Sequence, residues 1–217
     1  DEANAWFVGE PFKVFYDYKK EGIWQLGEEA AAAANGQEPG DIKVQDVDGN
    51  GVITTDDRII YSQRPDVTFG FNNTFNYKGF DLSVFLYARL GQWIAYDYNT
   101  TYRINALENG GNVDYWTPEN PTNAFPRPNK SKSYTQVTYY STLKYEDGSF
   151  FKIRDITLGY TFKPELLKHL NLSKLRVYAT AKNFFTFSKI DNYDPEQGGS
   201  ISFPMTKQLV FGLNVEF

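Results

Sequence analysis

The sequence predicts an all-β fold, and three observations support this prediction. Phe, Tyr and Trp make up 18% of the 217 residues, and aromatic side chains favour strands because they suit a pleated surface. Several segments alternate between apolar and polar residues, which is the period of a strand with two different faces. These segments are about 10 residues long or longer, whereas strands of soluble sheets have a mode of about 5 or 6 residues. Strands of about 9–11 residues cross a bilayer at a tilt, so the length favours a transmembrane β-barrel.

The first two alternating segments predict a hairpin. In residues 67–77 the apolar side chains occupy most odd positions, and in residues 80–90 they occupy the even positions. The intervening "YKG", residues 77–79, carries a tight-turn signal. We therefore expect two long antiparallel strands that share one apolar face.

Three further strands are expected in "SFFKIRDITLGYTF", "LRVYATAKN" and "KQLVFGLNVEF". Two short helices are expected as well, in "LGEEAAAAANG", which Asn35-Gly36 would end, and in "KPELLKHL", where Pro164 suits a first turn. Five strands, or six if "PFKVFYDYKKEGIW" adds one, are fewer than the roughly eight of a small closed barrel. We therefore expect the chain to be part of a larger antiparallel barrel.

The connections between the strands alternate in length. Residues 77–79 and 163–173 form short connections, whereas residues 91–147 and 185–206 form long ones rich in Asn, Pro, Gly and Tyr. Short turns on one side and long loops on the other are typical of an outer-membrane barrel. A soluble β-sandwich is the alternative, with alternation that marks a core face and a solvent face.

Composition excludes several classes of protein. The net charge of −5 argues against a nucleic-acid partner, because phosphate binding needs clustered positive charge. The sequence contains no Cys, which rules out disulfides and thiolate metal sites. It shows neither an apolar run of about 18 residues nor a charged and apolar leader, so we expect no transmembrane helix and no signal peptide in it.

The stretch "DVDGNGVITTDD", residues 46–57, matches an EF-hand type calcium loop. Such a loop needs oxygen ligands at positions 1, 3, 5, 7 and 12 and a glycine at position 6. Position 6 is Gly51, and the candidate calcium ligands are Asp46, Asp48, Asn50, the carbonyl of Val52, and Asp57. An aspartate at position 12 is one methylene shorter than the usual glutamate, which predicts weaker binding. No helix candidates flank the loop, and a turn that binds no metal is the alternative.

The sequence offers no convincing catalytic group, so we expect a protein that is not an enzyme. His169 is the only histidine, and it lies in a short connection without a matched acid and serine. The long loop, residues 91–147, carries candidate substrate-binding aromatics, because sugars and peptides stack on rings; the strongest are Trp93, Tyr96 and Trp116. The alternative is that the loop buries its own aromatic residues in order to stay folded.

Five ordered blocks resemble one family. They are "PGDIKVQDVDGNGVITTDDR", "RPDVTFGFNNTFNYKGFDLSVFL", "SFFKIRDITLGYTF", "LRVYATAKNFFTFSKIDNYDPE" and the terminal "LVFGLNVEF". Together they resemble the C-terminal part of SusC-like (SusC/RagA family) TonB-dependent transporters of the Bacteroidetes outer membrane. The resemblance runs from about Gly9 to Phe217, and the final phenylalanine is similar to an outer-membrane insertion signal.

This resemblance implies an architecture and partners. The family has a barrel of roughly 22 strands with a lumenal plug, and imports oligosaccharides or peptides with a SusD-like surface lipoprotein. Residues 1–217 would supply the C-terminal strands and contact outer-membrane lipid, while the plug and the segment that reaches the TonB complex are not expected here. Counting back from Phe217 would place residues 77–79 and 163–173 in the periplasm, and residues 46–57, 91–147 and 185–206 outside the cell.

Calcium would then order an extracellular loop. The favoured interpretation is a non-enzymatic segment of a nutrient importer, with glycans preferred over peptides as cargo. Two alternatives stay open, namely a soluble calcium-dependent carbohydrate-binding module and a surface adhesin that does not transport.

Overall fold

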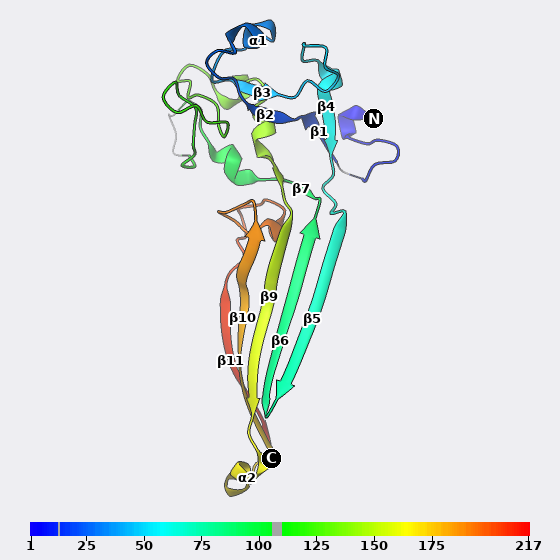
Figure 1. The fold of residues 1–217 in the computed structure, drawn as a ribbon, viewed down its shortest axis with the longest axis vertical. Coiled ribbons are helices and arrows are strands. Elements are labelled where there is room, and N and C mark those ends of the chain that lie inside the picture. Colours follow the sequence, from blue (N-terminus) through cyan, green and yellow to red (C-terminus); the bar gives the residue numbers. More distant parts are fainter. Residues whose placement is uncertain (13, 106–109) are drawn as a thin grey trace. The chain divides into compact units, whose positions relative to one another are not determined.

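The computed structural model of the chain describes residues 1–12, 14–105 and 110–217 and divides them into two compact units (Figure 1). Unit 1 consists of Asp1–Arg64, Trp93–Asp147 and Gly198–Ile201, and unit 2 of Pro65–Gln92, Gly148–Gln197 and Ser202–Phe217. Most of the long connection expected at residues 91–147 therefore belongs to unit 1. Residues 106–109 of that connection lie outside the described residues.

Unit 2 is built on one antiparallel sheet of five long strands, in the order β11-β10-β9-β6-β5 (Figure 1). All five strands expected from the alternation are confirmed, at β5 (Val67–Tyr77), β6 (Phe80–Leu90), β9 (Phe150–Thr161), β10 (Lys174–Ser188) and β11 (Gln208–Glu216). β10 runs on to Ser188, so the loop expected at residues 185–206 begins four residues later.

The hairpin of β5 and β6 closes through two residues. Tyr77 pairs with Phe80, which leaves Lys78 and Gly79 in the turn, with φ of 48° and 89°. Two successive positive φ values are typical of a type I′ turn, whose twist matches that of the flanking strands. A Cβ atom on Gly79 would lie 2.8 Å from the Thr161 carbonyl oxygen, so glycine suits this position in both space and conformation.

A β-bulge in β9 explains a break in the sequence pattern. Ile153 and Asp155 pair with consecutive residues of β6, Leu86 and Phe85, so Arg154 is the extra residue. A bulge of this kind shifts the alternation by one residue. Ile153 and Ile156 consequently lie on the same face of the sheet although three positions separate them.

The connection from β9 to β10 contains α2 (Pro164–Leu167) followed by the 3₁₀-helix η6 (Lys168–Leu170). This confirms the expected helix, with Pro164 in its first turn. The loop after β10 contains the 3₁₀-helix η7 (Pro195–Gln197). None of the helices among the described residues has the length and apolar character needed to cross a membrane.

Unit 1 contains three short two-stranded antiparallel sheets. They pair β1 (Phe15–Tyr18) with β4 (Arg58–Tyr61), β2 (Lys20–Ile23) with β3 (Ile42–Val44), and β7 (Trp93–Ala95) with β8 (Tyr145–Asp147). The segment "PFKVFYDYKKEGIW" forms the short strands β1 and β2, so it does not add the sixth long strand that the sequence left open; its Lys13 lies outside the described residues. The rest of unit 1 contributes the expected helix α1 (Glu29–Ala34) and the 3₁₀-helices η1 (Glu2–Asn4), η2 (Thr55–Asp57), η3 (Asp97–Thr101), η4 (Tyr134–Gln136) and η5 (Tyr140–Lys144).

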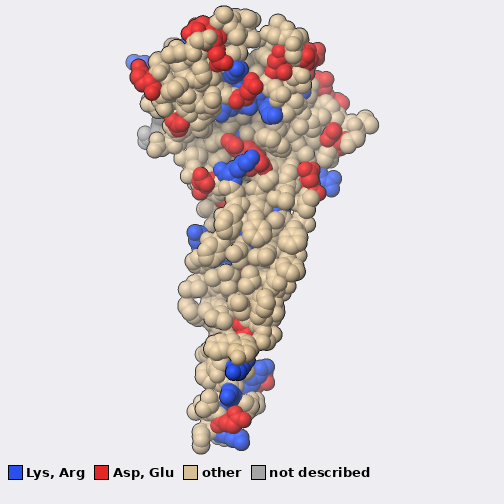
Figure 2. Space-filling model, in the orientation of Figure 1, with Lys and Arg blue, Asp and Glu red and all other residues tan. Residues whose placement is uncertain are grey.

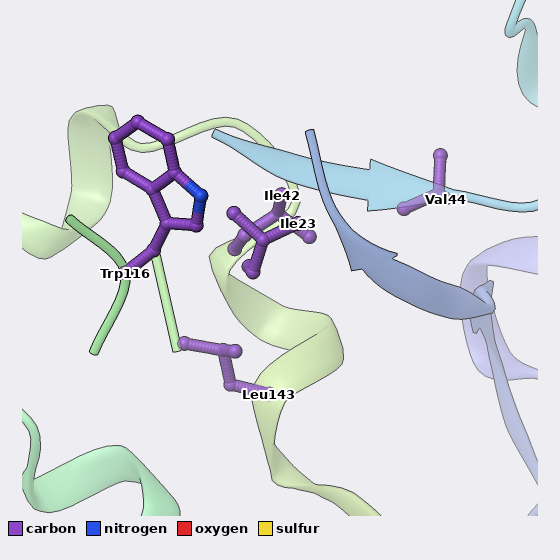
Figure 3. Packing of buried hydrophobic residues seen from close by; sticks show 5 residues of the cluster. All are labelled: Ile23, Ile42, Val44, Trp116 and Leu143. Carbon is purple, nitrogen blue, oxygen red and sulfur yellow. The ribbon is translucent and has the colours of Figure 1, made fainter. Parts of the chain in front are cut away.

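A small hydrophobic core holds unit 1 together (Figure 3). Its buried members are Ile23, Ile42, Val44, Trp116 and Leu143, which come from β2, β3, a loop and η5. Figure 3 shows the Trp116 ring beside Ile23 and Ile42. The core joins the beginning of the chain to the long connection that follows β6, so these loops are ordered by packing on each other.

Candidate functional site

The candidate metal site is the acidic loop, residues 46–57, which follows β3 and ends with η2. Gly49 and Gly51 have φ of 73° and 84°, and a Cβ atom on either would meet nothing within 4 Å. These glycines are therefore required by backbone conformation, since residues with a side chain rarely adopt positive φ. Short strands lie on either side, which confirms the expectation that no helix pair carries the loop.

Three carboxylates of the acidic loop converge. Oxygen atoms of Asp46, Asp48 and Asp57 all lie within 4.8 Å of one another. Asp46 accepts hydrogen bonds from the amides of Gly49 and Gly51, both at 2.7 Å. Backbone amides therefore hold the Asp46 carboxylate in its inward orientation, which is the arrangement a cation site in such a loop requires.

Asp57 is the buried member of the three. It has no exposed surface, and its two oxygens accept hydrogen bonds from the amides of Thr54 and Val47 at 2.7 Å each. The hydrogen bond from Thr54 is the main cause that lowers the pKa of Asp57, with help from the one from Val47. Asp57 is therefore ionised at neutral pH and completes a capping box with Thr54 at the start of η2.

The loop fits a hard divalent cation. Three negative charges this close repel one another unless donors or a cation offset them, and no Lys or Arg pairs with these carboxylates in the described parts of the chain. Asn50 was expected to offer its side-chain oxygen to calcium, but this Oδ1 already accepts a hydrogen bond from the amide of Val52 at 2.8 Å. An amide oxygen has a second lone pair, so Asn50 could still serve as a ligand.

The three aromatic residues expected to contact cargo lie in unit 1. Trp93 is half-buried in β7 and packs on Tyr61, with ring centroids 4.8 Å apart. Tyr96 and Trp116 are only 5% and 4% exposed, and the Trp116 Nε1 donates a hydrogen bond to Gln25 Oε1 at 2.8 Å. This burial favours the alternative in which the loop packs on itself, and a direct cargo contact by these rings stays an untested prediction.

One face of the unit 2 sheet is apolar and exposed. Its large side chains alternate along all five strands, and examples that are 46–69% exposed are Phe69, Phe71, Phe75, Leu158 and Leu213. On the side of this sheet seen in Figure 2, charged side chains are sparse along the middle of the strands. A continuous exposed surface of this kind marks a face that needs an apolar environment.

The opposite face of the same sheet is polar and carries paired charges. Arg176 donates to both carboxylate oxygens of Asp81, at 2.9 and 2.5 Å, and Thr157 bonds to Thr180 at 2.9 Å. Lys152 is completely buried in ion pairs. These residues were not among the site residues expected from the sequence, although charges at the polar positions of neighbouring strands were the available signal.

Sequence comparison places these features in a known context. No family model matches the chain. Over 96% of its length it is 31% identical to TonB-dependent receptor P3 of Formosa agariphila, of which it covers 22%. Over 79% of its length it is 31% identical to TonB-dependent receptor SusC of Bacteroides thetaiotaomicron, of which it covers 17%. The chain is homologous to one segment of the SusC-like TonB-dependent receptors.

Solved structures agree on the fold of this SusC-like segment. The structure titled RagAB peptide transporter covers 98% of the segment with a TM-score of 0.68 at 24% identity. The RagAB peptide importer in its open-open state gives a TM-score of 0.67 at 26% identity and is covered to 23% by the segment. The SusC-like segment thus spans about a fifth of the length of the relatives it matches.

Proposed function

We propose that this chain supplies C-terminal strands and extracellular loops to a barrel that imports nutrients across the outer membrane of a Bacteroidetes-type bacterium. The observation that carries the proposal is the five-stranded sheet of unit 2, which has an exposed apolar face and a polar, ion-paired face. A barrel wall between lipid and an aqueous lumen needs this distribution. The relatives named TonB-dependent receptors support the same assignment.

The proposed orientation follows from the connections. The hairpin turn after β5 and the α2–η6 connection are short and would face the periplasm, whereas the sequences of unit 1 would face the outside. Long loops on the outer side are typical of bacterial barrels. In this arrangement the acidic loop is extracellular.

The proposed partners come from the resemblance to SusC-like transporters. A SusD-like surface lipoprotein would capture cargo with unit 1, and the TonB complex would act through a part of the protein outside this chain. Oligosaccharides are the favoured cargo, because the loops of unit 1 are rich in aromatic and amide side chains. Peptides are a second candidate, since solved neighbours are titled peptide transporter and peptide importer.

We also propose that the acidic loop binds calcium. Asp46, Asp48 and Asp57 would supply carboxylates, and Asn50 and the carbonyl of Val52 would complete the oxygen set. The convergent carboxylates and the two glycine turns support this proposal. Calcium would then lock an extracellular loop rather than open a helix pair.

Uptake by living cells tests the proposal. A strain that lacks the gene, and the same strain with the gene restored, would be given fluorescent oligosaccharides or fluorescent peptides of matched size. We expect the restored gene to return periplasmic uptake of one cargo class. Restored cell binding without uptake would support an adhesin, and recovery of the protein in the aqueous phase after detergent partition would support a soluble binding module.

A further inference from the structure

Within unit 2, the loop that follows β10 folds back on β9 through a buried cluster of charges. Lys152 in β9 has a side chain with no exposed surface, and its Nζ lies 2.5 Å from Asp194 Oδ2 and 2.8 Å from Glu196 Oε2. The two carboxylates are themselves only 12% and 11% exposed. These three residues and Arg154 are called the loop anchor below.

Arg154 balances the charge of the loop anchor. Its Nη1 lies 3.0 Å from Glu196 Oε1, and its guanidinium sits 5.4 Å from the centre of the Tyr87 ring. Arg154 lies two positions after Lys152 in β9 and reaches Glu196, one of the two acids that Lys152 contacts. Two positive and two negative charges therefore meet, which is the condition under which buried ions are tolerated.

The two acids of the loop anchor are held in place by further hydrogen bonds and by buried neighbours in the loop. Asp194 Oδ1 accepts a hydrogen bond from the amide of Glu196 at 3.0 Å, and Thr186 donates to Asp194 Oδ2 at 3.4 Å. Pro195, between the two acids, is fully buried, and Ile190 is 9% exposed. Residues 190–197 are therefore held at Ile190 and at residues 194–196, while Asp191, Asn192 and Gln197 are exposed.

Asp194 also borders a cavity of about 780 Å³. The cavity lies between the end of β10 and its following loop, and its polar lining includes Thr186, Ser188, Asn192 and Asp194. The position of one wall of this cavity consequently depends on the loop anchor.

We infer that Lys152 is a positioning residue that fixes residues 190–197 against β9, so that this loop is a static wall and not a moving lid. This role of Lys152 does not depend on the proposed transport function, because it concerns only how residues 190–197 are held. Removing the Lys152 charge is expected to loosen the loop strongly, because the nearly buried Asp194 would lose its cation and Glu196 would keep only the partly exposed Arg154.

Trypsin provides a local probe of this loop. Lys189 is exposed and precedes Ile190, which is buried, so cleavage between them requires Ile190 to leave its site. The experiment uses the longest natural polypeptide that contains this chain, purified in detergent, and follows cleavage after Lys189 by mass spectrometry. For Lys152→Met we expect cleavage at least tenfold faster than in the wild type.

Lys182→Met is the matched control. Lys182 lies on the same sheet and pairs with Asp155 at 3.8 Å, but it is 45% exposed and outside the anchor. We expect its cleavage rate after Lys189 to change less than twofold. Equal rates in Lys152→Met and the wild type, or equal acceleration in both variants, would overturn the inference.

A triple variant that removes three of the charges of the loop anchor distinguishes loss of charge pairing from general misfolding. In Lys152→Met/Asp194→Asn/Glu196→Gln no buried acid is left unpaired, so cleavage should fall back toward the wild-type rate. Cleavage in the triple variant that is as fast as in Lys152→Met, with an intact barrel by gel mobility without heating, would show that the charge pairing itself does not hold the loop.

Discussion

At the scale of single residues, burial decides what an aromatic side chain does. Trp116 and Tyr115 are neighbours in the sequence, yet Trp116 is 4% exposed and Tyr115 is 43% exposed. The sequence could not separate them, because a long irregular connection has no periodicity that marks its inner side. Burial of Trp116 in one core with Ile23, Ile42 and Val44, which all precede it by more than 70 positions, is visible only in the folded unit.

This burial predicts that Trp116→Ala acts on stability. Loss of the ring from the core of unit 1 should lower its free energy of unfolding by about 3–5 kcal/mol. Tyr115→Ala is the matched control and should cost less than about 1 kcal/mol. Hydrogen exchange of peptides from unit 1 would measure both. A Trp116→Ala protein of wild-type stability that no longer binds cargo would instead support the direct cargo contact.

Asp57 carries a second prediction at this scale. Its lowered pKa means that its contribution to stability is present above the unfolded pKa of about 3.9 and is lost as pH falls through the lower folded value. Asp57→Asn should therefore reduce protection of residues 46–57 at pH 7, even with a chelator present, and flatten the acid part of the profile. Asp56→Asn, at the exposed neighbouring position, is the control. Equal pH profiles for the wild type and Asp57→Asn would contradict this explanation.

At the scale of elements, strict alternation made the strands of unit 2 predictable. Their bounds agree with the expected segments, because one exposed apolar face leaves a period of two in the sequence. The end of β10 was missed because the register shifts between Lys182 and Phe185, where Asn183 adopts a φ of 59° and breaks the alternation. The short strands of unit 1 were missed because three or four residues are too few to show a period.

The two faces of β6 predict opposite outcomes for the same substitution. Val84 lies on the apolar face opposite Ile156, while Ser83 lies on the polar face and bonds to Asn72 at 3.3 Å. Val84→Arg should destabilise the barrel by about 2–4 kcal/mol if this position lies near the bilayer centre. Ser83→Arg should leave assembly largely intact. Folded protein would be quantified in membranes by gel mobility without heating, and equal assembly of the two variants would contradict a lipid-facing Val84.

At the scale of the whole molecule, the two units are stabilised in different ways. Unit 1 has a buried core and an acidic loop, whereas unit 2 exposes its apolar side chains and pairs its charges on the other face. The sequence indicated the sheet and the acidic loop, but it did not show that the loops form a unit of their own. A treatment that acts only on the acidic loop should consequently change the stability of unit 1 and leave the sheet of unit 2 unchanged.

Adding or removing calcium should distinguish the stability of unit 1 from that of unit 2. Extracellular calcium modules commonly bind with a dissociation constant of about 10⁻⁴–10⁻³ M, so 10 mM calcium should stabilise the acidic loop by about 1.4–2.7 kcal/mol through linkage. We expect a chelator to raise hydrogen exchange in the peptides of unit 1 around residues 46–57, while peptides from β5, β6 and β9 stay unchanged. Asp46→Asn/Asp48→Asn should abolish the calcium response, because it removes two of the three convergent carboxylates. No response in the wild type would contradict the metal proposal, and an equal response in both units would mean that calcium acts outside the acidic loop.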